Sequence, residues 1–175
     1  MKPINIVFQS NVFVARFMHN LITAIIEQLE LQLATAISAS QDAHSSATHS
    51  ENIADNKYDT LAVEAAYLAH GQSMRISDLQ ETIHRYKHFQ RPTFTPQSSI
   101  RLGALVDLEN NKGEVQRVFI GPAAGGLKIG DSLHTITVVT TSTPLGRALL
   151  DKCIDDEIEL NINNRLEKFI VVDIQ

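Results

Sequence analysis

Apolar residues recur at three- and four-residue steps over 11–37, and neither Gly nor Pro interrupts them. This spacing predicts an amphipathic helix, with Ser10 as its N-cap. A second periodic segment, over 56–89, has near-heptad spacing, which is typical of the narrow seam of a two-stranded coiled coil. We therefore expect an antiparallel helical hairpin that extends roughly 45 Å. The predicted seam of the second helix comprises Leu61, Ala65, Leu68, Gln72, Ile76, Leu79, Ile83 and Tyr86.

The stretch between the two helices, Ser38–Asp59, is polar and partly acidic. Its short polar side chains compete with the helix for backbone hydrogen bonds, so the pattern predicts a loop at the tip of the hairpin. Loops held out by a rigid scaffold are frequent places for chemistry or contact. The tip is therefore the first candidate functional region.

Two prolines within five residues end the helical region, and they predict a linker over 92–99 between an N-terminal domain, 1–91, and a C-terminal domain, 100–175. A single helix is expected over 144–152, with Thr143 as N-cap and Pro144 at its first position. The pattern predicts an α+β domain with an antiparallel sheet. Strands are expected over 100–108, 115–120, 133–140, 157–162 and 166–174, with turns over 109–114 and 121–126 and at 163–164.

Composition favours a soluble globular protein, because 43% of the residues are apolar and 20% are charged. A net charge of −5 argues against wholesale binding of nucleic acid. The single cysteine, Cys153, allows no internal disulfide and no cysteine-based zinc site, and we expect it to be a small packing residue. Charged residues interrupt the first helix before a membrane-spanning length is reached, so we expect a cytoplasmic protein without a membrane partner.

The segment 70–91 is locally basic. The simpler interpretation is a solvated helix face; the functional one is a patch that holds RNA phosphates or a polymerase surface. The histidines at 84 and 88 are four residues apart, but no third metal ligand is visible nearby. The candidate patch comprises Arg75, Arg85, Lys87 and Arg91.

Three stretches of the C-terminal domain resemble a known family in the same order. Thr143–Lys152 resembles the S-P-L-G-x-A-L-L-G-K stretch of bacterial Gre-type transcription elongation factors. Phe119–Pro122 resembles the V-G-P strand end that precedes it, and Asp155–Glu157 resembles the G-D-E before the last hairpin. The resemblance covers most of 98–175. It implies an FKBP-like C-terminal domain that follows an N-terminal antiparallel coiled coil.

The resemblance also implies a function in transcription on DNA. In the family the C-terminal domain docks on RNA polymerase, and the coiled coil enters the secondary channel. Two tip carboxylates help to hold a catalytic Mg²⁺, so that the polymerase cleaves backtracked RNA. The protein would then be no enzyme by itself and would need no cofactor of its own, because the Mg²⁺ is shared with the polymerase and nascent RNA is an indirect partner. The docking residues implied here are Pro144, Leu145, Gly146 and Arg147.

Two alignments of the tip are open. Asp55-Asn56 matches the family's Glu-Asn, which places Asn52 where the other acid stands; matching Glu51-Asn52 instead places Thr48 there. Either way one acid is missing, so we expect either stimulation of cleavage or modulation of the active site. Asp59 lies about one turn beyond Asp55 and could replace the missing acid. The tip candidates are therefore Asp55, Asp59 and Glu51, with Asp55 as the Mg²⁺ ligand; the simpler interpretation is that these acids only cap the second helix.

Two other classes of function are open. An FKBP-like prolyl isomerase or chaperone needs an aromatic-lined apolar pocket, whereas Phe119 and Phe169 are the only aromatics of 100–175. A non-catalytic interaction module whose coiled coil grips an unrelated partner would need neither a pocket nor tip carboxylates. Capture of polymerase subunits separates this module from a polymerase-binding factor.

Overall fold

A computed structural model describes residues 5–48, 60–131, 135–162 and 165–175, with side chains over 17–42, 67–131, 135–161 and 165–175. The chain divides into two compact units. One unit contains the first helix, α1, up to Ile25 together with 88–175; the other contains 26–87. The prediction of a domain boundary at 92–99 differs from this division, because the beginning of α1 groups with the C-terminal residues.

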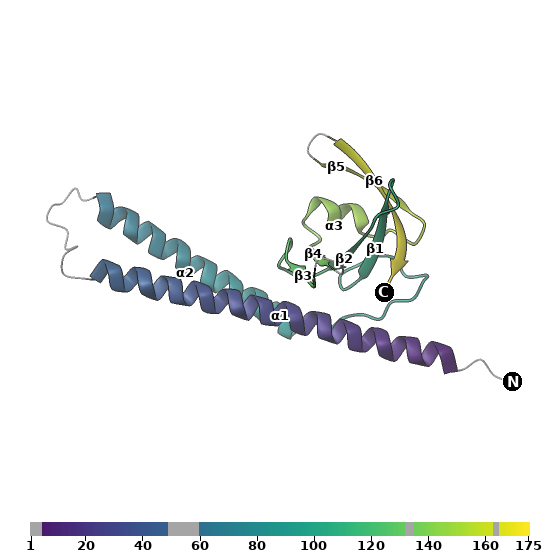
Figure 1. Cartoon of the computed structure of the whole chain (residues 1–175), viewed down its shortest axis with the longest axis horizontal. Coiled ribbons are helices and arrows are strands. Elements are labelled where there is room, and N and C mark those ends of the chain that lie inside the picture. Colours follow the sequence, from purple (N-terminus) through teal and green to yellow (C-terminus); the bar gives the residue numbers. More distant parts are fainter. Residues whose placement is uncertain (1–4, 49–59, 132–134, 163–164) are drawn as a thin grey trace. The chain divides into compact units, whose positions relative to one another are not determined.

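Helix α1, Asn5–Thr48, extends beyond the predicted 11–37 in both directions (Figure 1). Ser10 lies inside the helix, so its predicted role as N-cap is wrong. The predicted loop is also wrong over Ser38–Thr48, which continues the helix. The reason is that alanine, the strongest helix former, recurs among the polar residues from Ala36 onward, and neither Gly nor Pro is present to stop the helix.

Helix α2, Thr60–Lys87, returns along α1 within the second unit (Figure 1). Lys87 Nζ donates to Glu30 Oε1 at 2.7 Å, which brings the end of α2 beside α1 and makes the two helices antiparallel. Of the predicted seam, Leu79 and Ile83 are buried, but Leu68 is 67% exposed. The seam prediction is therefore wrong at Leu68, and the structure does not establish a coiled coil along the whole helix pair.

The six strands form one sheet in the order β3-β4-β2-β1-β6-β5. All neighbours are antiparallel except β2 and β4, which are parallel, so the predicted purely antiparallel sheet is wrong at this pair. The short strand β3, which the sequence did not predict, reverses the chain between β2 and β4 and makes this pairing possible. The strands are β1 Leu105–Asn110, β2 Val115–Ile120, β3 Lys128–Ile129, β4 Ile136–Val139, β5 Glu157–Ile162 and β6 Arg165–Ile174.

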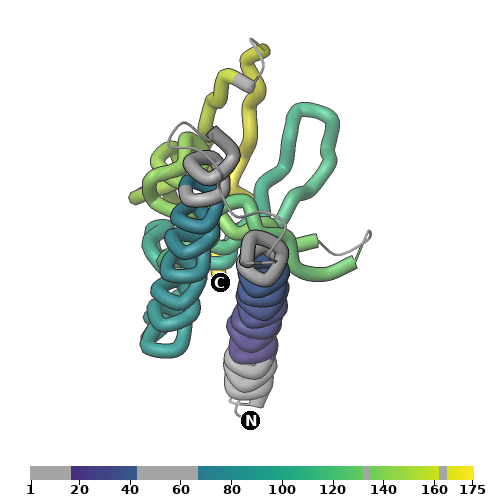
Figure 2. The backbone as a smooth tube through the Cα atoms, turned by 90° about the vertical axis from the view of Figure 1, so that its left-hand side faces the viewer, coloured from purple at the N-terminus to yellow at the C-terminus, as the bar shows by residue number. Residues whose placement is uncertain are grey.

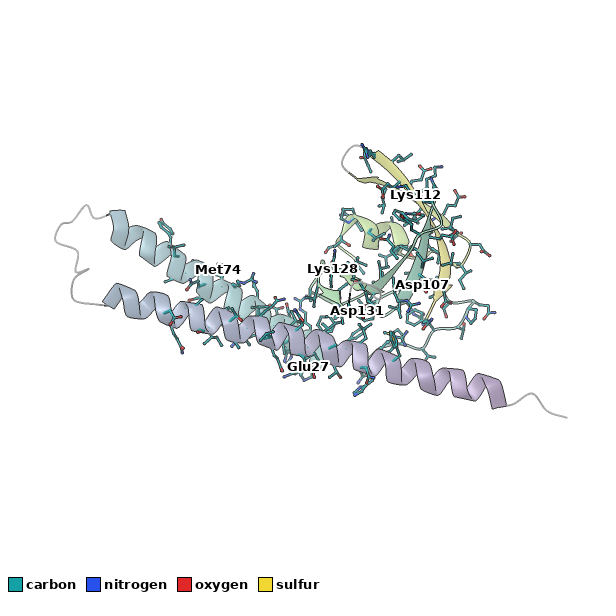
Figure 3. The ribbon with its side chains drawn as sticks, in the orientation of Figure 1. Glu27, Met74, Asp107, Lys112, Lys128 and Asp131 are labelled. Carbon is teal, nitrogen blue, oxygen red and sulfur yellow. The ribbon has the colours of Figure 1, made fainter. Side chains whose placement is uncertain are left out.

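The predicted turn between β1 and β2 is confirmed (Figure 2). Asn110 Oδ1 accepts hydrogen bonds from the backbone N–H groups of Lys112 and Glu114, at 2.9 and 3.0 Å. Gly113 adopts a φ of 77°, which is readily accessible to glycine. Lys112 lies at the tip of this hairpin (Figure 3).

One face of the sheet carries the core of the C-terminal residues, and α3, Pro144–Leu149, packs against it. Phe94 from the predicted linker also packs on this core. Cys153 is exposed, so its predicted packing role is wrong; it lies in the irregular segment after α3, where its backbone N–H donates to Asp156 Oδ2 at 2.7 Å. The buried core residues are Ile100, Ala104, Val106, Leu108, Val118, Ile120, Val139, Leu149, Ile158, Phe169, Val171 and Ile174.

The stretch Phe17–Asp42 of α1 has the length and composition of a membrane-spanning helix. Core helices of soluble proteins share these features, and Met18, Leu21, Ile25 and Leu29 are buried in this structure. One such helix is weak evidence for a membrane. The expected cytoplasmic location therefore stays a prediction.

Candidate functional site

The segment that resembles the Gre-type motif forms the start of α3. Thr143 caps this helix, as predicted: its Oγ1 accepts a hydrogen bond from the N–H of Gly146 at 3.1 Å and donates to the carbonyl of Thr140 at 2.7 Å. Pro144 occupies the first helical position, where its missing N–H costs no helical hydrogen bond. The end of β4 is thereby tied to α3.

Gly146 is required by a close approach of two backbone segments. A Cβ atom at this position would lie 2.0 Å from the carbonyl oxygen of Thr140 and 2.8 Å from its carbon. Real Cβ atoms do not come this close, so the helix could not sit on the Thr140 turn with any larger residue. The glycine of the motif therefore has a structural role in this chain.

A groove of about 670 Å³ begins at this helix start. Thr143, Pro144 and Leu145 line it from α3, and Leu160 and Phe169 line it from β5 and β6. Of the four implied docking residues, Pro144 and Arg147 are exposed, Leu145 is half-buried and Gly146 is buried. The structure thus brings two of them to the groove wall and leaves Arg147 accessible nearby on the same short helix.

The aromatic side chains of the C-terminal domain do not form an open pocket. Phe119 is fully buried, and Phe169 is 5% exposed and belongs to the core. Phe169 meets the groove only as part of a wall that also carries polar residues, among them Asn161 and Glu167. An aromatic-lined pocket of the kind that a prolyl isomerase needs is therefore absent from the described part of 100–175.

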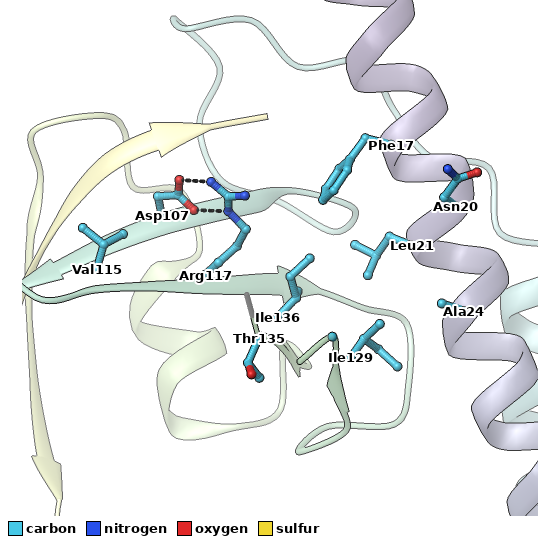
Figure 4. Close-up of a pocket in the computed structure, with 11 residues that line it drawn as sticks. Phe17, Asn20, Leu21, Ala24, Asp107, Val115, Arg117, Ile129, Thr135 and Ile136 are labelled. Carbon is cyan, nitrogen blue, oxygen red and sulfur yellow. Dashed lines mark hydrogen bonds and ion pairs between the residues drawn. The ribbon is translucent and has the colours of Figure 1, made fainter. Parts of the chain in front are cut away.

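A second cavity, of about 500 Å³, lies in the same unit between α1 and the sheet (Figure 4). Phe17 and Leu21 of α1 point toward Ile129 and Ile136 across it. This wall is apolar. The cavity therefore offers contact surface but brings few reactive groups together.

At one side of this cavity Arg117 makes a bidentate ion pair with Asp107 (Figure 4). The Nε atom lies 2.6 Å from Asp107 Oδ1, and Nη2 donates to Oδ2. The hydrogen bonds to Asp107 raise the pKa of Arg117, although partial burial lowers it and nearby Asp173 adds to the increase. Arg117 therefore stays charged and is no proton donor for chemistry.

The predicted basic patch is largely occupied by intramolecular contacts. Arg85 pairs with Glu81, and Lys87 pairs with Glu30. Arg91 Nε donates to the carbonyl of Gly103 at 2.8 Å, and its guanidinium lies 5.1 Å from the centroid of the Phe94 ring.

Arg91 differs from the other patch members, because burial lowers its pKa. Its Nη2 is buried without a hydrogen-bond partner among the described residues. Arg75 is exposed on α2. Arg85, Lys87 and Arg91 are therefore each committed to a different local contact, and the role of these residues and Arg75 as one binding patch stays a prediction.

The predicted tip acids Glu51, Asp55 and Asp59 lie outside the described residues, as does Asn52. Their role, including Asp55 as a Mg²⁺ ligand, stays a prediction. Within the ranges that the structure describes, no group of three or more His, Cys, Asp or Glu side chains is arranged to hold a metal ion.

The groove residues from β5 and β6 and the Asp107–Arg117 pair were not predicted. In β6 the buried Phe169 lies between exposed neighbours, but no sequence signal showed that its face of the sheet would continue to α3. Asp107 and Arg117 were visible as opposite charges in two strands joined by a turn, and the register of that hairpin makes them direct cross-strand neighbours.

No protein-family model and no curated protein matches the chain. Several solved structures resemble it. GreA factor homolog 1 (Gfh1) of Thermus thermophilus is 24% identical, over 86% of this chain and 94% of that one, with a TM-score of 0.37.

Gfh1 of Thermus aquaticus is 23% identical, over 87% and 94% of the two chains, with a TM-score of 0.38. The prokaryotic transcription elongation factor GreA/GreB from Nitrosomonas europaea is 16% identical, over 55% and 78%, with a TM-score of 0.36. TM-scores this low do not establish a shared fold over the whole chain, so these similarities assign no function.

Proposed function

We propose that the protein is a Gre-like factor that binds RNA polymerase and acts on it through the end of its helix pair. The observation that supports this proposal is that the segment resembling the Gre-type motif, Thr143–Lys152, contains both residues that the fold requires and residues that are exposed. Thr143, Gly146 and Leu149 are fully used by the fold, as cap, close contact and core. Pro144 and Arg147 are exposed beside the groove, so they remain available to a partner.

The helix pair supplies the reach that this function needs. At 1.5 Å per residue, the part of α1 in the second unit, 26–48, extends about 35 Å and the 28 residues of α2 about 42 Å. The connecting stretch 49–59 carries Glu51, Asp55 and Asp59. We assign this stretch to the secondary channel of the polymerase, where its carboxylates would approach the shared Mg²⁺.

Binding to purified RNA polymerase is the first test, with Arg147→Ala as the variant and Lys128→Ala as the matched control. Both residues are exposed cations, but Lys128 lies on β3 and does not line the groove. Arg147→Ala should weaken binding at least about fivefold, since arginines are frequent interface hot spots, whereas Lys128→Ala should change it little. Equal effects of the two variants, or failure of the unaltered chain to bind, would refute the proposed docking.

Transcript cleavage by a backtracked polymerase complex is the second test, and it also separates the two tip alignments. If Asn52 occupies the position of the missing acid, Asn52→Asp supplies the second carboxylate and should increase cleavage, while Thr48→Asp should not. The opposite result selects the alternative alignment. If the chain binds polymerase but neither variant cleaves RNA, the protein modulates the active site without lending a metal ligand.

A further inference from the structure

The sheet has a second face whose exposed part combines apolar and acidic side chains. The strand register places Val115, Glu109, Ile170 and Glu157 in one row across β2, β1, β6 and β5. Alternation along β6 puts Ile170 on the face opposite to the buried Phe169 and Val171. We call this row, with Leu166 and Val172 of β6, the acidic sheet face.

The apolar side chains of this face are unusually exposed to solvent for residues of a sheet. Val115 is 58% exposed, Leu166 62%, Ile170 40% and Val172 38%. At the other end of β1 and β2, on the same alternation, Leu105 and Phe119 are buried. The acidic sheet face is therefore the uncovered part of a face that is otherwise covered, and an exposed apolar patch with a polar rim is typical of a protein-binding surface.

Carboxylates outnumber cations on this face. Two described cations, Arg117 and Lys168, lie on the same side of the sheet as these six residues. Each is paired with a neighbouring carboxylate, Arg117 with Asp107 and Lys168 with Glu159. Glu109 and Glu157 flank Ile170 on both sides. Neither glutamate forms an ion pair at contact distance within the described residues, although Glu157 also attracts Lys168 electrostatically, so Glu109 is the less engaged of the two.

We propose that the acidic sheet face binds a basic amphipathic segment of a partner protein. The apolar side chains of such a segment would cover Ile170, Leu166 and Val172, while its lysines or arginines would meet Glu109 and Glu157. Negative charge on the face excludes nucleic acid and anionic lipid as occupants. The surface is on the strands, away from Arg147 on α3, and the proposal is independent of polymerase docking.

The test uses the full chain and two synthetic peptides with the same apolar pattern, one alternating Leu with Lys and the other alternating Leu with Glu. Backbone amide shifts followed by NMR report where each peptide binds. The lysine peptide should bind saturably and shift the amides of β5 and β6, and the glutamate peptide should not. Charge reversal by Glu109→Lys with Glu157→Lys should invert this preference, by up to roughly fivefold for each surface charge pair.

The apolar contribution is tested separately with Ile170→Thr, which keeps a β-branched residue in the strand. This variant should weaken the lysine peptide several-fold, while Met74→Gln, at an exposed apolar position of α2 (Figure 3), should have no effect. Equal binding of the two peptides, shifts located elsewhere, or an unchanged affinity of Ile170→Thr would overturn the proposal. Polymerase binding through α3 should be unaffected by the charge reversal.

Discussion

Replacement of Gly146 by alanine should destabilise the C-terminal residues strongly, although alanine normally favours helices. The added Cβ would lie 2.0 Å from the Thr140 carbonyl oxygen and 3.0 Å from Thr143 Oγ1. Relief of the first contact requires a backbone shift, which costs about 3 kcal/mol at the upper end of overpacking effects. Displacement of the Thr143 cap costs about 1 kcal/mol, and alanine regains about 1 kcal/mol of helix propensity. The expected net loss is therefore about 3 kcal/mol.

Gly71→Ala is the matched control, because the same substitution should have the opposite sign there. Gly71 lies inside α2, and nothing is within 4 Å of a Cβ built on it. Only the propensity gain remains, so stability should rise by about 0.5–1 kcal/mol. The two variants make the same chemical change in two helices and differ only in the space around the new methyl group.

Native-state hydrogen exchange measures the two units separately, because individual amides report local stability. The Val171 amide, which donates to the Asp156 carbonyl at 3.0 Å, reports on the sheet. Gly146→Ala should speed its exchange roughly 100-fold, from the tenfold change per 1.4 kcal/mol. If exchange stays within threefold of the unaltered chain, the close approach at Thr140 is not what requires glycine.

Two further predictions concern ionisable groups. Asp107→Asn should lower the free energy of unfolding by about 1 kcal/mol, since it removes the charge that pairs with the partly solvated Arg117. Urea unfolding measures this change, and Glu159→Gln, in a more exposed pair, should have less than half the effect. Burial raises the pKa of Tyr86 above that of an unfolded tyrosine, so the folded state holds the phenol proton more tightly. Its contribution to stability is complete below about pH 10 and falls as the pH rises further; Tyr86→Phe should flatten that alkaline decline, and an unchanged slope would contradict the assignment.

Much of the C-terminal fold followed from local chemistry. Pro144 after Thr143 predicted the cap and start of α3, and Gly113 after two asparagines predicted the β1–β2 turn; both were confirmed. These signals are local because each depends on a few neighbouring backbone groups. The parallel pairing of β2 and β4 was not predictable in this way, since strand direction depends on how the chain crosses between them, and β3 is too short to give a period.

In the helical region, two predictions from local sequence were wrong. Polar residues after Ile37 predicted a loop, but α1 continues to Thr48, because propensities of short polar residues are weak unless Gly or Pro stops the helix. Apolar spacing in α2 predicted one seam, yet Leu68 is exposed while Leu79 and Ile83 are buried. Periodicity identifies the face of a helix, but it does not show over which turns that face is covered.

The extension of α1 to Thr48 changes which residues lie between the two helices. The stretch between the helices shrinks from 38–59 to 49–59, and Thr48 becomes the last residue of α1. In the alignment that uses Thr48, the two acid positions fall on the helix end and on the connecting stretch; in the alignment that uses Asn52, both fall within the connecting stretch. A carboxylate placed at Thr48, the last residue of α1, would meet the negative end of the helix macrodipole, so the alignment that uses Asn52 is the more favourable one. Asn52→Asp is therefore the substitution that we expect to restore cleavage, with Asp55 as the other ligand.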